Sequence, residues 1–224
     1  MRQFTTALLA AIALAGIGAS SANAADPVPD SWTGFYAGLN VGYDWSNVSG
    51  NGTLGAATAT GSETLTGIIG GGQIGYNWQM ANNIVLGVEA DFQGSDASSS
   101  TNKSYYGFAY SGTDRMTYFG TIRGRVGYMI DRWLPYITAG FGYGQGTTNA
   151  TLSGVRTFSE AQSNGAWVVG AGVETALTGK WTVKFEYLAM GADIQNSFNT
   201  SRGTLTVNGT VLSNVVRTGL NYRF

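Results

Sequence analysis

Val-Val-Arg-Thr-Gly-Leu-Asn-Tyr-Arg-Phe, residues 215–224, is the stretch that decides the fold. Its apolar and polar side chains alternate: the apolar positions are Val216, Leu220, Tyr222 and Phe224, and the polar positions are Arg217, Asn221 and Arg223. Alternation with period two gives a strand with two different faces. Full charges on one face do not suit an ordinary hydrophobic core, but a membrane-spanning barrel has lipid outside and a polar lumen inside. The stretch therefore predicts a strand of a transmembrane β-barrel.

The other end of the sequence resembles an export signal. One positive charge in residues 1–3 precedes an apolar run from Leu8 to Ile17 and a small-residue cleavage site that ends at Ala24. The apolar run is shorter than the roughly 20 residues of a spanning helix. We therefore predict a signal peptide over residues 1–24, cleaved after Ala24, a short periplasmic linker over 25–31 and an outer-membrane barrel domain over 32–224. An exported chain that spans by strands belongs in a Gram-negative outer membrane.

Composition agrees with a membrane location. Only 11% of the residues are charged, whereas a water-exposed surface usually carries about 25–35%. The 34 glycines and 12% aromatic residues suit many strands and turns, and the absence of cysteine excludes a disulfide framework. The formal net charge of −1 gives no reason to expect a nucleic-acid partner.

Eight segments of the chain can be read with period two, and the first, residues 35–45, is the clearest. Long connections (46–66, 94–113, 145–164 and 190–210) alternate with short ones (79–83, 129–133 and 178–180). Barrels of this kind have short turns in the periplasm and long loops outside the cell. The sequence therefore predicts an all-β fold, an eight-stranded antiparallel up-and-down transmembrane β-barrel with short periplasmic turns, long extracellular loops and both termini in the periplasm.

Aromatic residues gather at the ends of the predicted strands, as expected at the two membrane interfaces. A soluble lipocalin-like barrel, with its apolar face inward, has the same alternation. Two aromatic belts, the aromatic residue at position 224 and polar connections on alternate sides favour the membrane barrel. The belts comprise Phe35, Trp78, Tyr128, Trp181, Tyr222 and Phe224 on the turn side, and Trp45, Phe92, Tyr143 and Trp167 on the loop side.

The polar faces of the strands carry charges of both signs. Eight strands leave a lumen just wide enough for side chains to fill, and an unpaired charge there is costly to desolvate. We therefore expect a lumen largely plugged by ion pairs, although a narrow or gated ion path and a ligand contact remain open alternatives. The predicted network comprises Asp44, Glu89, Asp91, Glu174 and Glu186 with Arg115, Arg123, Arg125, Lys184, Arg217 and Arg223.

Residue types argue against catalysis and cofactor binding. The chain has no histidine and no cysteine, so it lacks the parts for a Ser-His-acid triad, a Cys-His pair or a typical zinc site. Residues 70–75 match the dinucleotide pattern G-x-G-x-x-G, but we expect no helix after them to hold a phosphate, and we expect these glycines to allow close backbone approach in a small barrel. We expect no enzymatic activity, no catalytic residues, no metal and no cofactor.

The segment Trp32–Tyr43, the glycine-rich second strand and the ending Tyr222-Arg223-Phe224 resemble the alphaproteobacterial outer-membrane immunogenic protein, or surface-antigen, family. Its barrel is similar to the OmpA-type transmembrane domain. The resemblance implies an abundant surface protein that contacts lipopolysaccharide, supports envelope integrity and is seen by host antibodies. It also implies that Leu220, Tyr222 and Phe224 belong to the signal read by the outer-membrane assembly machinery.

Three functions follow as hypotheses. The first is a structural surface protein of the outer membrane, and the second is a small porin-like channel. The third is binding of haem or a host ligand through the loops, since some relatives are described as haem binders; without histidine, tyrosine or methionine would have to ligate the iron. The loop residues considered for that role are Tyr105, Tyr106, Tyr110 and Arg156.

Overall fold

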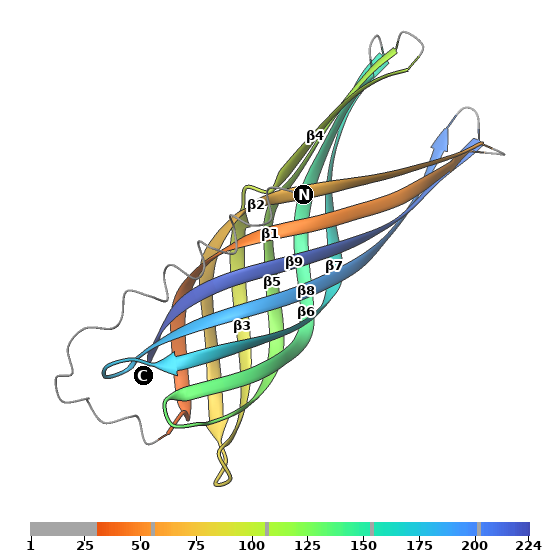
Figure 1. The fold of residues 1–224 in the computed structure, drawn as a ribbon. Helices are drawn as coiled ribbons and strands as arrows, with labels where there is room; N and C mark the ends of the chain where they lie inside the picture. Colours follow the sequence, from red (N-terminus) through yellow and green to blue (C-terminus); the bar gives the residue numbers. More distant parts are fainter. Residues whose placement is uncertain (1–30, 55–56, 106–107, 153–154, 201–202) are drawn as a thin grey trace, which may run out of the picture.

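The computed structural model describes residues 31–54, 57–105, 108–152, 155–200 and 203–224, which form one closed antiparallel sheet (Figure 1). The predicted signal peptide, and the linker apart from Ser31, lie outside the described residues. Within the described part of the chain, no helix is long and apolar enough to cross a membrane. The strands are β1 (Gly34–Leu54), β2 (Ala57–Gln79), β3 (Ile84–Ser95), β4 (Ser98–Tyr105), β5 (Phe108–Tyr128), β6 (Trp133–Leu152), β7 (Val155–Ala176), β8 (Trp181–Thr200) and β9 (Gly203–Arg223).

The sheet closes into a barrel because β1 pairs with both β2 and β9. The elements β3 and β4 are two parts of one barrel strand, since both pair with β5. Between them, the Ile68 amide donates to the Asp96 carboxylate at 2.6 Å, and Ala97 is buried against Gly67. Counted in this way the barrel has eight strands, and the predicted fold class is confirmed.

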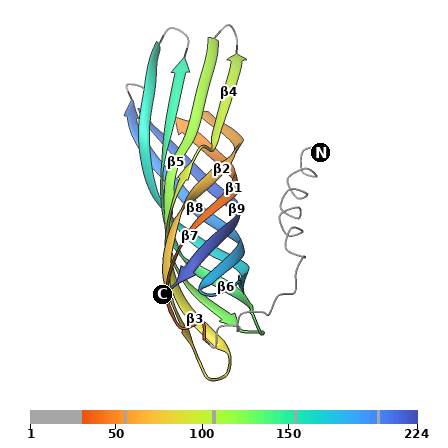
Figure 2. The same cartoon turned by 90° about the vertical axis from the view of Figure 1, so that its left-hand side faces the viewer.

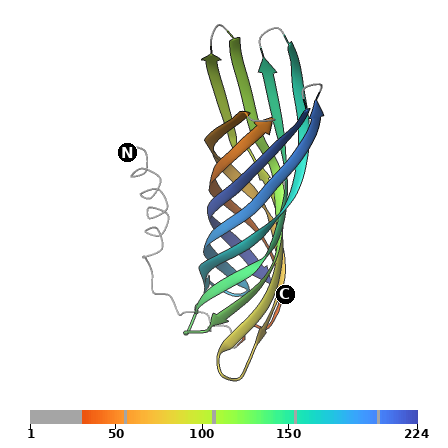
Figure 3. The same cartoon turned by 90° about the vertical axis from the view of Figure 1, so that its right-hand side faces the viewer.

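Two ends of the barrel differ (Figures 2 and 3). At one end, here the turn end, short turns join β2 to β3, β5 to β6 and β7 to β8, and residue 224 lies close by. Each turn holds one residue with positive φ: Asn83 (65°), Asp131 (51°) and Gly179 (63°). Asn, Asp and Gly are the residues that best tolerate this conformation, so the sequence fixes these turns locally.

Long hairpins project from the other end, here the hairpin end (Figure 2). These connections are predicted from the sequence to be loops, but β1 continues to Leu54 and β2 begins at Ala57, and the other three hairpins are similar. The strands extend because paired backbones satisfy their own hydrogen bonds, and Thr and Val side chains suit a pleated sheet. Polar contacts across the ladder support this, as between Thr64 Oγ1 and Asn47 Oδ1 at 3.1 Å.

Apolar side chains point outward and charged ones inward, the reverse of a lipocalin-like barrel. Leu39 is 73% exposed and Phe141 79%, which in this architecture is the surface that meets lipid. Eight of the ten residues assigned to the aromatic belts are exposed on this outer face, and the other two, Trp45 and Tyr222, pack there against exposed aromatic rings. Neighbours pack in pairs there: Trp181 with Tyr222 (5.1 Å between ring centroids), Tyr222 with Phe224 (5.5 Å) and Trp45 with Tyr187 (6.3 Å).

Inside the barrel, the inward charged side chains form a layer, here the charged layer. An apolar cluster lies on each side of it, one toward each end of the barrel. The turn-end cap consists of Trp32, Val85, Leu134 and Ala176, with Met129 packed against it. The hairpin-end cap consists of Ile69, Phe119, Val168, Leu188, Met190 and Val215, with Met116 packed against it. The order along β7 illustrates the layering, because Val168 belongs to the hairpin-end cap, Glu174 to the charged layer and Ala176 to the turn-end cap.

Candidate functional site

Inward positions on five strands bring four acids and four bases together. None is more than 7% exposed, and the four negative and four positive charges balance. β3 contributes the acids Glu89 and Asp91, β5 contributes Arg123 and Arg125, β7 contributes Glu174, β8 contributes Lys184 and Glu186, and β9 contributes Arg217.

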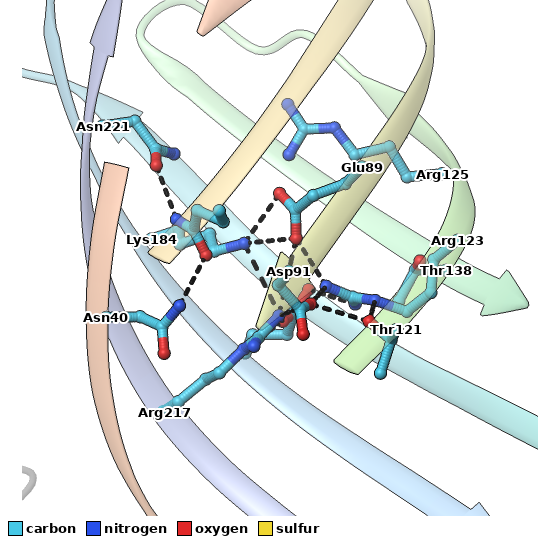
Figure 4. Close-up of polar contacts among 12 residues, drawn as sticks. Asn40, Glu89, Asp91, Thr121, Arg123, Arg125, Thr138, Lys184, Arg217 and Asn221 are labelled. Atoms are coloured by element: carbon cyan, nitrogen blue, oxygen red, sulfur yellow. Dashed lines mark hydrogen bonds and ion pairs between the residues drawn. The ribbon is translucent and has the colours of Figure 1, made fainter. Parts of the chain in front are cut away.

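Arg123 lies at the centre of this charge network (Figure 4). Its guanidinium contacts three carboxylates: Glu89, Asp91 (Nη2 to Oδ2, 2.9 Å) and Glu186 (Nη1 to Oε1, 2.9 Å). Its Nε also donates to Thr121 Oγ1 at 2.9 Å. A planar guanidinium is suited to such a position, because its donors point in several fixed directions within one plane.

The ion pair between Lys184 and Glu89 spans the lumen. Lys184 Nζ lies 2.7 and 2.8 Å from the two Glu89 oxygens. In the closed sheet, β8 and β3 are four strands apart in either direction, so this pair joins opposite walls. Arg217 adds a second connection across the barrel, from β9 to Asp91 on β3 at 2.9 Å, and also contacts Glu186 at 2.6 Å.

A second centre lies nearer the turn end. Arg125 Nη1 contacts Glu174 Oε2 at 2.8 Å, and its Nε donates to Asn77 Oδ1 at 2.9 Å. The guanidinium lies 5.0 Å from the ring centroids of both Tyr36 and Tyr136, which is cation–π geometry. The two tyrosine hydroxyls connect the centres, because Tyr36 donates to Glu89 (2.7 Å) and Tyr136 to Glu186 (2.9 Å).

Three residues predicted for the network lie outside it. Arg115 is exposed, because a β-bulge between Met116 and Tyr118 shifts the alternation of β5 by one residue and turns Met116 inward. Arg223 is half-buried at the turn end, where it donates to the Ser31 carbonyl oxygen at 3.1 Å. Asp44 is fully buried but accepts hydrogen bonds from Ser46 and Ser213, and it has no ion pair among the described residues.

Sequence reasoning missed the aromatic residues inside the barrel. Trp32, assigned only to the start of the domain, is 1% exposed and closes the turn end. Its backbone amide donates to Gln79 Oε1 at 2.7 Å, and the Arg223 guanidinium lies 5.2 Å from its ring centroid. Alternation along the strands places Tyr36 and Tyr136 at inward positions, but it does not show what they contact. Gly75 pairs with Tyr36 and Gly172 pairs with Tyr136, and these glycines leave the space that the rings fill.

The geometry defines an integral β-barrel of the outer-membrane type. Residues 10–224 match the family model for the outer membrane protein beta-barrel domain. The chain is 36% identical over 248 residues to the 31 kDa outer-membrane immunogenic protein of Brucella melitensis biotype 1, covering 99% of this chain and 95% of that protein. It therefore belongs to the outer membrane protein β-barrel family, together with the alphaproteobacterial outer-membrane immunogenic proteins, and is an outer-membrane protein.

Two solved structures show the same fold at low sequence identity. OprG from Pseudomonas aeruginosa has a TM-score of 0.50 at 14% identity, covering 86% of this chain and 96% of that one. The outer membrane protease OmpT from Escherichia coli has a TM-score of 0.51 at 12% identity, covering 85% and 97%. At these identities the likeness concerns the barrel alone, and the activity in the second name belongs to that protein.

Proposed function

We propose that this protein is a non-enzymatic structural component of the outer membrane, a closed barrel that supports envelope integrity and presents its hairpins as a surface antigen. The barrel is oriented with the turn end and both termini in the periplasm and the hairpin end outside the cell. The apolar belt meets outer-membrane lipid, and lipopolysaccharide is the partner in the outer leaflet.

The observation that carries this proposal is the charge network across the lumen. Pairs such as Lys184 with Glu89 join opposite walls, and an apolar cap lies on each side of the charged layer. Ion movement would require breaking desolvated ion pairs, and leaving one partner unpaired costs about 3–5 kcal/mol. A lumen filled in this way supports a structural role better than transport.

The envelope role predicts a phenotype. A strain without the gene is expected to become more sensitive to detergent, because a barrel that supports the outer leaflet is lost. Growth across a detergent series measures this, with the wild-type gene restored in the same strain as the control. Unchanged sensitivity would contradict the structural proposal.

A small gated channel is the second candidate, favoured by incomplete pairing within the network. Among the described residues, Arg217 Nη1, Arg125 Nη2 and Asp91 Oδ1 are buried without a hydrogen-bond partner. These atoms could accept new partners if the network rearranged.

Planar-bilayer recording separates the two candidates. The refolded mature chain is expected to show no discrete conductance steps across a range of salt and voltage, because the paired charges block the lumen. Discrete steps that change when Arg123 and Arg125 are both replaced by glutamine would favour the channel.

Binding of haem or a host ligand stays a prediction, because Tyr106 and the side chains of Tyr105, Tyr110 and Arg156 lie outside the described residues.

We also infer that the outward residues Leu220, Tyr222 and Phe224 are read by the outer-membrane assembly machinery. Leu220 and Tyr222 lie on the outer face of β9, and Phe224 follows directly and is exposed, so an assembly factor could contact all three before closure. Deleting Phe224 is expected to reduce the amount of folded protein in the outer membrane, measured by heat-modifiable mobility of membrane fractions. An equal amount of folded protein would argue against this role, and Asp131→Asn at a turn serves as the control.

A further inference from the structure

A cavity of about 410 Å³ lies at the hairpin end, above the hairpin-end cap and outside the charge network. Its wall is largely apolar: Leu65, Met116, Phe119 and Met190 line it, and the last three belong to the cap or pack against it. The methionines are flexible and polarizable, so this wall can adapt to apolar groups of different shape. The cavity is large enough for a small organic ligand.

Two buried hydroxyls, those of Ser46 and Ser213, belong to the polar part of the cavity lining, and they form its floor on the side of Asp44. Ser46 is 2% exposed and Ser213 4%. Both hydroxyls donate hydrogen bonds to the Asp44 carboxylate: Ser46 Oγ lies 3.1 Å from each carboxylate oxygen, and Ser213 Oγ lies 2.5 Å from Oδ1. A hydroxyl has one proton to donate and two lone pairs, so what remains for a ligand is acceptor capacity. The floor therefore selects a ligand group that donates.

Charge favours a cationic donor. Asp44 is fully buried, and among the described residues it makes no ion pair, so two neutral hydroxyls are its described partners. A positive group held against these serine oxygens would compensate the carboxylate one layer below. Arg115 and Glu63 also line the cavity but have opposite charges, which leaves Asp44 as the excess charge near the floor.

We propose that this cavity binds a small amphiphile in which an apolar body carries a primary ammonium group. The body packs against Met116, Phe119 and Met190, and the ammonium donates to Ser46 Oγ and Ser213 Oγ above Asp44. This site lies beyond the charge network, so it does not depend on whether the lumen conducts.

Three probes of one shape test the proposal: 4-phenylbutylamine, 4-phenylbutanol and 4-phenylbutyrate, titrated calorimetrically into the full barrel in lipid nanodiscs, with empty nanodiscs subtracted. The amine is expected to bind about tenfold tighter than the alcohol, because its hydrogen bonds are charge-assisted, and the carboxylate weakest. Equal affinity of the three probes, or heats no larger than those of empty nanodiscs, would overturn the proposal.

Two variants locate the binding. Asp44→Asn is expected to remove the tenfold advantage of the amine and leave the alcohol unchanged, while Asp131→Asn at the turn end keeps it. Ala166→Trp, which adds bulk to the cavity wall, is expected to weaken amine and alcohol alike. An amine preference that persists in folded Asp44→Asn protein would overturn the role of Asp44, and this reading stands even if Ala166→Trp does not fold.

Discussion

Replacing Arg123 with methionine is expected to lower the free energy of unfolding by about 3–5 kcal/mol, because three buried acids then share only Arg217 and Lys184 and one negative charge in the lumen is left uncompensated. Arg123 contacts Glu89, Asp91 and Glu186, and it is 2% exposed. The loss comes from the buried negative charge left behind more than from the strength of any single ion pair. Urea unfolding in lipid vesicles, followed by tryptophan fluorescence, measures the difference.

Arg115→Met is the matched control for this experiment. It removes the same charge from the same strand, but Arg115 is exposed at the hairpin end. The free energy of unfolding is therefore expected to change by no more than about 0.5 kcal/mol. The stability of the Arg123→Lys protein should lie between those of the two methionine variants. Lysine retains the charge but lacks the planar guanidinium that contacts three acids. Equal stability of the Arg123→Met and Arg115→Met proteins would show that the network does not hold the barrel together.

The eight-stranded barrel could be predicted because each element carries its own signal. Alternation in 215–224 fixes which side chains of β9 face lipid, and the turn residues Asn83, Asp131 and Gly179 suit positive φ. The hairpins could not be read in the same way. Their Ser, Thr, Asn and Gly content is typical of loops, but pairing with a neighbouring strand decides the conformation there.

The candidate site was predictable in composition but not in connectivity. Which charges face inward follows from period two, so Arg123 and Glu89 were found. That Glu89 contacts Lys184, 95 residues away, depends on how the sheet closes, which no local pattern encodes. Arg115 was misplaced because Met116 and Tyr118 are both apolar, and alternation around Thr117 continues smoothly through the bulge.

Gly71→Ala is expected to destabilise the barrel, whereas the same substitution at either neighbour in the run Gly70-Gly71-Gly72 is not. This run lies within β2, which a short turn joins to β3, so the helix that a dinucleotide-binding pattern requires does not follow it. A Cβ at Gly71 would lie 2.0 Å from the Phe92 carbonyl oxygen and 2.9 Å from Gln93 Cα. Both are backbone atoms of the neighbouring strand, so relief requires moving β3. Overpacking of this kind costs about 1–3 kcal/mol and sometimes more.

The neighbouring glycines provide the controls. A Cβ at Gly70 or Gly72 has its nearest neighbour at 3.7 Å, which is ordinary contact. Gly70→Ala and Gly72→Ala should therefore fold with unchanged or slightly higher stability, because alanine reduces the freedom of the unfolded chain. If all three variants unfold at the same urea concentration, close packing of β2 on β3 is not what requires glycine at position 71. If only Gly71→Ala is destabilised, the close approach of β2 and β3 at Phe92 and Gln93 is what requires glycine at position 71.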